Sequence, residues 1–291
     1  MFLVCGASGL VGFQLCNLFD KLNIDYYGTY NSRKIDKTNM IKVNFFNPEE
    51  IEELLTSKKI KCCIFSIVER VTDTCENDWN AIKNTNINMV NTVSYLCNKL
   101  DIKFIHISTD YVFDGKSGPY NEDDPLNPIS IYGKTKLASE HILLEEDTKH
   151  LVIRGNVLYD YSPHTSASFL NWVVSSLKGN QEIKVVEDQF NNPTWTRSMS
   201  DIIELSIEND LEGIIHWGDS EHISRFEFAK LIAKKFSLND SLIKPVLTSE
   251  LNQPARRPLQ SGLSTEKLVN MLDIIPPSIE DCLDEIIKTA L

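Results

Sequence analysis

The chain opens with a feature that restricts its fold more than any other. A short apolar run, Phe2–Cys5, leads directly into a glycine turn, Gly6-Ala7-Ser8-Gly9-Leu10-Val11-Gly12, and apolar residues at helical spacing follow to Phe19. A strand, a glycine turn and a helix in this order form the opening unit of dinucleotide-binding folds. Gly6 permits the tight turn, Gly9 lets a pyrophosphate approach the backbone, and Gly12 allows close packing of helix on strand. The alternative interpretation is a purely structural turn.

The rest of the chain repeats the alternation of strand and helix. Apolar strand-like runs are expected at 26–30, 41–45, 61–68, 104–108 and 151–154, with amphipathic helices between them. This pattern predicts an α/β fold with one doubly wound, parallel, Rossmann-type sheet over residues 1–158. A late strand near 213–218 is expected to return to that sheet, and a helix is expected to be capped at Ser200-Asp201. Residues 159–291 otherwise read as a smaller C-terminal cap that binds substrate.

The end of the second strand indicates which dinucleotide would bind. Sites for NAD usually place an acidic residue here to hold the ribose 2′-hydroxyl, whereas this chain has Ser32-Arg33-Lys34. Because a cation suits a 2′-phosphate, Ser32 and Arg33 favour NADPH, with NADH as the alternative cofactor. A solvated basic loop is the competing interpretation.

Tyr132 and Lys136 carry the chemistry that the sequence suggests. They lie four residues apart on an expected helix, so both side chains can reach one cleft. The hydroxyls of Ser108 and Thr109 come from the end of the fifth strand, where ligands of open α/β sheets bind. An ammonium beside the phenol should lower the tyrosine pKa and make it a better proton donor, as in carbonyl reductases. His106, in the middle of that strand, is expected to be a satisfied core residue.

The bulk properties exclude several classes of protein. A net charge of −12 over 291 residues provides no basic stripe for nucleic acid. The apolar runs are too short for a membrane span, and the N-terminus reads as a strand and not as a signal peptide. The seven cysteines show no metal-ligand spacing, so no metal site is expected. They are interpreted as reduced, mostly buried thiols of a cytoplasmic protein.

Together these motifs resemble the extended short-chain dehydrogenases/reductases, and within them the dTDP-4-dehydrorhamnose reductase family. The resemblance covers the whole chain and includes Ser108-Thr109-Asp110-Tyr111-Val112-Phe113-Asp114-Gly115, Tyr132-Gly133-Lys134-Thr135-Lys136, Gln189-x-x-x-Pro193-Thr194 and Arg257-Pro258. It implies reduction of the C4 keto group of a nucleotide-linked 4-keto-6-deoxyhexose, giving a dTDP- or UDP-linked L-rhamnose. Thr109 would bind the carbonyl, Tyr132 would donate the proton, and Lys136 would tune the tyrosine and hold the nicotinamide ribose. The implied cofactor-binding residues are Gly6, Ser8, Gly9, Leu10, Val11, Asn44, Phe45, Val68 and Glu69, and the implied substrate-binding residues are Thr109, Asp110, Asn156, Gln189 and Arg257.

Two departures from the family pattern keep alternatives open. Ile67-Val68-Glu69-Arg70 stands where the family has a small Ala-Ala segment, and Gly155-Asn156-Val157-Leu158 replaces an aromatic substrate contact. One alternative is a bifunctional 3,5-epimerase/4-reductase, with Asp110 or His164 as an acid or base. The other is a non-catalytic, NADP-binding regulatory subunit like the β subunit of methionine adenosyltransferase. A homodimer is expected by analogy with the superfamily.

Overall fold

Seven parallel strands form the central sheet, in the order β11-β6-β5-β4-β1-β2-β3. The structure is a computed structural model, and it describes residues 1–145, 149–162 and 168–290. The strands are β1 (Phe2–Cys5), β2 (Tyr26–Tyr30), β3 (Met40–Lys42), β4 (Cys62–Phe65), β5 (Lys103–Thr109), β6 (His150–Gly155) and β11 (Gly213–Trp217). The order reverses direction beside β1, which is the point where open α/β sheets bind ligands. The expected doubly wound sheet is confirmed.

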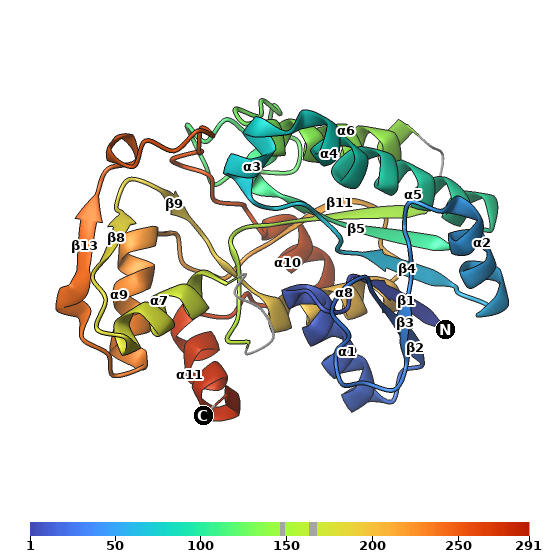
Figure 1. Cartoon of the computed structure of the whole chain (residues 1–291), viewed down its shortest axis with the longest axis horizontal. Helices are drawn as coiled ribbons and strands as arrows, with labels where there is room; N and C mark the ends of the chain where they lie inside the picture. The colour runs from blue at the N-terminus through green and yellow to red at the C-terminus, as the bar shows by residue number, and fades with distance from the viewer. Residues whose placement is uncertain (146–148, 163–167, 291) are drawn as a thin grey trace.

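Helices cover both faces of the sheet (Figure 1). One layer consists of α1 (Leu10–Leu22), α8 (Thr196–Glu208) and α10 (Glu266–Leu272), and the other of α2 (Pro48–Ser57), α5 (Met89–Lys99) and α6 (Ile131–Glu145). Side chains alternate along each strand, so Val4 packs into the first layer and Leu3 into the second. Because both faces are buried, the strands are almost continuously apolar.

A second, smaller core lies beyond the carboxyl ends of the strands (Figure 1). It packs α7 (Phe169–Lys178), α9 (Arg225–Lys235) and α11 (Ile279–Ala290) around the parallel pair β8 (Ile183–Val186) and β13 (Ile243–Val246). Two short strand pairs form separate sheets: β7 (Leu158–Tyr159) with β10 (Thr194–Trp195), and β9 (Phe190–Asn191) with β12 (Ile223–Ser224).

Short helical segments complete the structure. They are α3 (Thr72–Asn77), α4 (Trp79–Lys83), the π-helical turn η1 (Asn84–Asn88), and the 3-10 turns η2 (Asp110–Val112), η3 (Asp240–Leu242) and η4 (Thr248–Glu250). No helix within the described ranges is long and apolar enough to cross a membrane. The seven cysteines all fall within those ranges, and they are buried free thiols.

The structure corrects three expectations about element boundaries. The fourth strand ends at Phe65 and not at Val68, because its neighbour β1 stops at Cys5, where the glycine turn begins. The third strand ends at Lys42, opposite Tyr30. Ser200 does not cap a helix: it lies within α8 and donates a hydrogen bond to the carbonyl of Thr196, one turn earlier.

Candidate active site

A cavity of about 720 Å³ lies at the carboxyl ends of the central strands, facing the smaller core. The glycine turn, the ends of β4 and β5, helix α6 and parts of α7, β8 and α9 all contribute to its lining. Ten of the residues predicted for the site line this cavity: Gly9, Leu10, Val11, Val68, Thr109, Asp110, Tyr132, Lys136, Gln189 and Arg257. The sheet thus brings together residues from positions throughout the chain.

The glycine turn has the geometry that a pyrophosphate requires. Gly6 adopts a φ of +86°, a conformation that side chains disfavour. A Cβ on Gly12 would lie 2.3 Å from the carbonyl oxygen of Gly6, so only glycine allows α1 to approach so closely. Gly9 is the N-cap of α1 and no side chain caps it. The first N–H groups of the helix therefore remain available to an anion.

Other predicted cofactor residues lie near the turn without lining the cavity. The guanidinium of Arg33, which is exposed like Ser32, donates a hydrogen bond to the carbonyl of Ser8. Arg33 is thereby held beside the glycine turn, on the side expected for an adenine ribose. This placement is compatible with the predicted contact to a 2′-phosphate.

At Asn44, Phe45 and Glu69 the side chains have other contacts. Phe45 is buried in the core, with its ring 6.0 Å from that of Phe65, so its side chain does not face a ligand. The Asn44 side chain accepts a hydrogen bond from the N–H of Phe46. Glu69 exchanges backbone hydrogen bonds with the side chain of Asn86, and its carboxylate accepts from the N–H of Val71.

The predicted catalytic residues meet at the floor of the cavity. Thr109 ends β5, and Tyr132 and Lys136 come from the first two turns of α6. The Thr109 side chain lies close enough to the Tyr132 phenol to favour its ionised form. Hydroxyl, phenol and amine thus approach one space, as a group that polarises and protonates a carbonyl requires.

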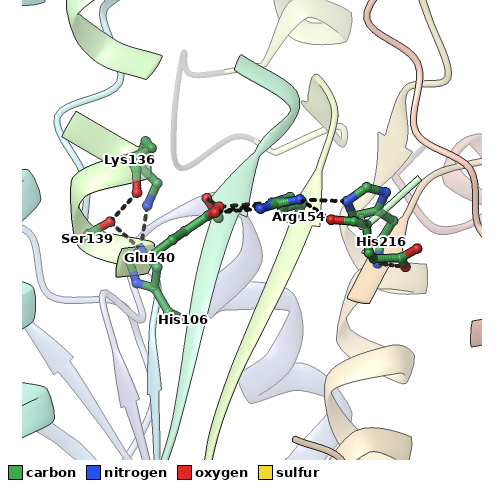
Figure 2. Close-up of polar contacts among 8 residues, drawn as sticks. His106, Lys136, Ser139, Glu140, Arg154 and His216 are labelled. Atoms are coloured by element: carbon green, nitrogen blue, oxygen red, sulfur yellow. Dashed lines mark hydrogen bonds and ion pairs between the residues drawn. The ribbon is translucent and has the colours of Figure 1, made fainter. Parts of the chain in front are cut away.

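The electrostatics of Tyr132 differ from the sequence-based expectation. Burial and the nearby Asp110 carboxylate raise the tyrosine pKa well above its usual value, and the Thr109 side chain opposes this only in part. Lys136 is not among the groups that lower it: its amine lies 2.8 Å from Nε2 of His106 (Figure 2), and it donates a hydrogen bond of 2.8 Å to the carbonyl of Ile107. Burial lowers the pKa of Lys136 to about 7. The expectation of a lowered tyrosine pKa is therefore wrong.

His106 also departs from what was expected. Its Nε2 contacts the amine of Lys136, and its Nδ1 has no hydrogen-bond partner within the described structure. It is a buried histidine of the core, but it is only half satisfied.

Asp110 lies beside this group, buried and lining the cavity. One of its carboxylate oxygens accepts a hydrogen bond of 3.0 Å from Thr109, while the other has no partner among the described residues. Burial raises the Asp110 pKa to about 6. A half-paired carboxylate at a cavity wall can accept a hydrogen bond or a proton from a ligand.

The predicted substrate-binding residues Gln189 and Arg257 differ in their contacts. Gln189 lines the cavity and donates to the Thr248 hydroxyl at 2.9 Å. Arg257 also lines it, but its guanidinium already forms a bidentate pair with Asp73, at 2.9 and 2.8 Å.

The Asn156 side chain does not line the cavity, although both of its chain neighbours, Gly155 and Val157, do. It is fully buried, and its amide donates to Asn192 at 2.6 Å. His164 lies outside the described residues.

Sequence reasoning missed several residues of the cap side of the cavity. They are Arg225, Lys184, Phe169 and Trp172. The guanidinium of Arg225 lies 5.1 Å from the centre of the Phe169 ring, and it interacts electrostatically with the Asp110 carboxylate. One signal was available: Ser224 and Glu227 form a capping box, which places Arg225 at the first position of α9.

The charges of the cavity are opposite to those of the whole chain. Among the described residues, one carboxylate, that of Asp110, and five cationic side chains line it: Arg70, Lys136, Lys184, Arg225 and Arg257. An acidic protein, with a net charge of −12, therefore has a basic cavity at its strand ends. Such a cavity favours ligands that carry phosphates.

Comparison with known proteins agrees with this geometry. The family model described as "RmlD substrate binding domain" matches residues 1–291. The dTDP-4-dehydrorhamnose reductase of Burkholderia thailandensis is 29% identical, with 94% of each chain covered. The β subunit of methionine adenosyltransferase 2 from Bos taurus is 27% identical over 91% of this chain and 80% of its own.

Among solved structures, the dTDP-4-dehydrorhamnose reductase of Bacillus anthracis in complex with NADP superimposes with a TM-score of 0.89 at 26% identity, with 99% of both chains covered. The sheet, the glycine turn and the match over the full length lead to one conclusion: this chain belongs to the RmlD substrate binding domain family.

Proposed function

We propose that this protein is an NADPH-dependent reductase of the C4 keto group of a nucleotide-linked 4-keto-6-deoxyhexose, forming a dTDP- or UDP-linked L-rhamnose. The observation that carries the proposal is that Thr109, Tyr132 and Lys136 line the same cavity as the uncapped glycine turn of α1. Similar proteins include a dTDP-4-dehydrorhamnose reductase, and the solved structure of another such reductase contains NADP.

The residues present fit a dinucleotide. Gly9 and the start of α1 would hold the pyrophosphate, Arg33 would face the adenine ribose, and Lys136 would lie near the nicotinamide ribose. When bound, NADPH supplies the hydride for reduction of the carbonyl.

The chain itself contributes orientation and a proton. Thr109 would donate a hydrogen bond to the carbonyl oxygen, and the phenol of Tyr132 would transfer its proton to that oxygen as charge develops there. The high pKa of the Tyr132 phenol keeps it protonated, and therefore able to donate, throughout the neutral range. Arg225 and Lys184 would attract the diphosphate of the nucleotide and so fix the sugar in the cavity.

The test is NADPH oxidation with dTDP- and UDP-4-keto-6-deoxyglucose, each with and without a separate 3,5-epimerase. Turnover that depends on the added epimerase supports the reductase. Absence of turnover in every combination would exclude it.

Asp110 gives specific support to a second candidate, the bifunctional 3,5-epimerase/4-reductase. Epimerisation requires a base that removes a proton beside the carbonyl, and the half-paired carboxylate of Asp110 lies beside Thr109. Its pKa of about 6 would leave it largely ionised at neutral pH. Incorporation of solvent deuterium at C3 and C5 without an added epimerase would establish this activity, and its absence would exclude it.

A third candidate is a regulatory role, supported by the similarity to methionine adenosyltransferase β subunits. NADPH binding without turnover of any 4-keto sugar, together with binding to a methionine adenosyltransferase catalytic subunit, would favour it.

The seven buried free thiols suit a reducing compartment such as the cytoplasm.

A further inference from the structure

Lys136 has a partner in this structure that the proposed reaction does not use. Its amine lies 2.8 Å from Nε2 of His106 (Figure 2) and 2.8 Å from the carbonyl oxygen of Ile107, the next residue of β5. The lysine is therefore anchored to the strand beneath the cavity while it still contributes to the cavity lining.

His106 offers the lysine a single polar contact point. It is fully buried, its ring is stacked on that of Phe104 with centroids 6.4 Å apart, and Phe65 lies on the neighbouring strand. Within the described chain its Nδ1 has no hydrogen-bond partner. A buried polar atom left without a partner is unfavourable, so stability alone does not explain a histidine at this position.

The contacts of Nε2 bear on where the proton of the imidazole lies. Ser139 lies 3.2 Å from Nε2, but its hydroxyl donates to the carbonyl of Lys136 at 2.7 Å, which leaves Nε2 to the lysine. When Lys136 is an ammonium it has only donors, so Nε2 is then the bare acceptor and Nδ1 carries the hydrogen. Burial and the charge of Lys136 hold the His106 pKa well below its usual value, and the ring stays neutral.

We propose that His106 is a positioning residue for Lys136: its bare Nε2 accepts a hydrogen bond from the lysine amine, and so keeps that amine charged and held at the cavity floor. The inference deepens the proposed function, because it concerns the protonation state in which Lys136 acts.

Two opposing effects make such an acceptor necessary. Burial disfavours the ammonium and lowers the Lys136 pKa to about 7, while the Glu140 carboxylate, one turn later on α6, raises it. A hydrogen bond accepted from the charged form also favours that form. Other titratable groups on the elements around α6 have their own contacts: Arg154 pairs with Glu140, Glu76 accepts from the N–H of Ile131, and Asp110 acts on Tyr132.

The first test needs neither ligand nor activity. Nitrogen NMR of the protein labelled at histidine, assigned with a His106→Gln variant, reports which ring nitrogen carries the hydrogen between pH 6 and pH 8. We expect the Nδ1–H form, with Nε2 bare. A spectrum with hydrogen on Nε2 would show that the imidazole donates to the lysine, and would overturn the proposal.

The second test separates positioning from a structural role. In His106→Leu the lysine loses an acceptor, so the pH above which kcat/KM and NADPH affinity fall should decrease by about one pH unit. His106→Gln, whose amide oxygen can accept in place of Nε2, should restore the profile of the natural protein. A uniform loss at every pH, or a glutamine variant that behaves like the leucine variant, would overturn the proposal.

The two proposals fail in different ways. If no 4-keto sugar is reduced, the proposed function fails, while the NMR result still decides the role of His106. If His106→Leu does not fold, the ring tautomer and the glutamine profile decide it.

Discussion

Replacing Arg154 with methionine should destabilise the protein more than any change at the surface. Arg154 and Glu140 are both fully buried, and the guanidinium donates to the carboxylate through Nε at 3.1 Å and Nη2 at 2.7 Å (Figure 2). Nη1 also lies 3.2 Å from Nε2 of His216. Without the arginine, the hydroxyl of Ser108 is the one hydrogen-bond partner that the Glu140 carboxylate keeps among the described residues.

The magnitude follows from this burial. Breaking a fully buried ion pair from one side leaves an uncompensated charge and costs about 3–5 kcal/mol. Since a typical domain has roughly 5–15 kcal/mol in total, Arg154→Met should lose a large part of the free energy of unfolding. Arg197→Met is the matched control: Arg197 pairs with Glu285 at 3.3 Å, and the two side chains are 36% and 39% exposed. That variant should lose less than about 1 kcal/mol.

Urea unfolding followed by circular dichroism measures both variants. The double variant Arg154→Met/Glu140→Leu removes both charges and should recover much of the loss, because an apolar pair of similar volume needs no counterion. A loss below about 1 kcal/mol for Arg154→Met would refute the reasoning. So would a double variant that is as unstable as the sum of the two single variants.

Three further predictions concern the cavity. Tyr132→Phe should lower kcat about a hundredfold or more while the NADPH dissociation constant is unchanged, because only the proton donor is removed; a fully active variant would contradict this role. Gly12→Ala should weaken NADPH binding and lower the free energy of unfolding by about 1–3 kcal/mol, because its Cβ would lie 2.3 Å from the Gly6 carbonyl oxygen. Titration with NADPH measures the first effect and urea unfolding the second. Arg225→Met should raise KM for the nucleotide sugar about tenfold or more, whereas Arg256→Met, at an exposed position, should leave KM unchanged. Equal KM values for the two variants would show that Arg225 does not bind the substrate.

The sequence alone determines the features that depend on local geometry. A glycine at a φ of +86° and another facing a carbonyl oxygen define a turn that few sequences can make, so the opening βα unit could be predicted. Strands buried on both faces are almost continuously apolar, which made the parallel sheet recognisable. The i, i+4 spacing likewise placed Tyr132 and Lys136 on one side of α6.

The tertiary structure decides what each side chain contacts. Arg225 lines the cavity although it lies on α9, far along the chain. Arg257 forms an ion pair with Asp73, and the Asn156 amide donates a hydrogen bond to Asn192. Neither burial nor a partner distant in sequence can be predicted from spacing, and both control pKa values. Spacing could place the Lys136 amine near the Tyr132 phenol. Only the packing of β5 against α6 brings that amine into contact with His106.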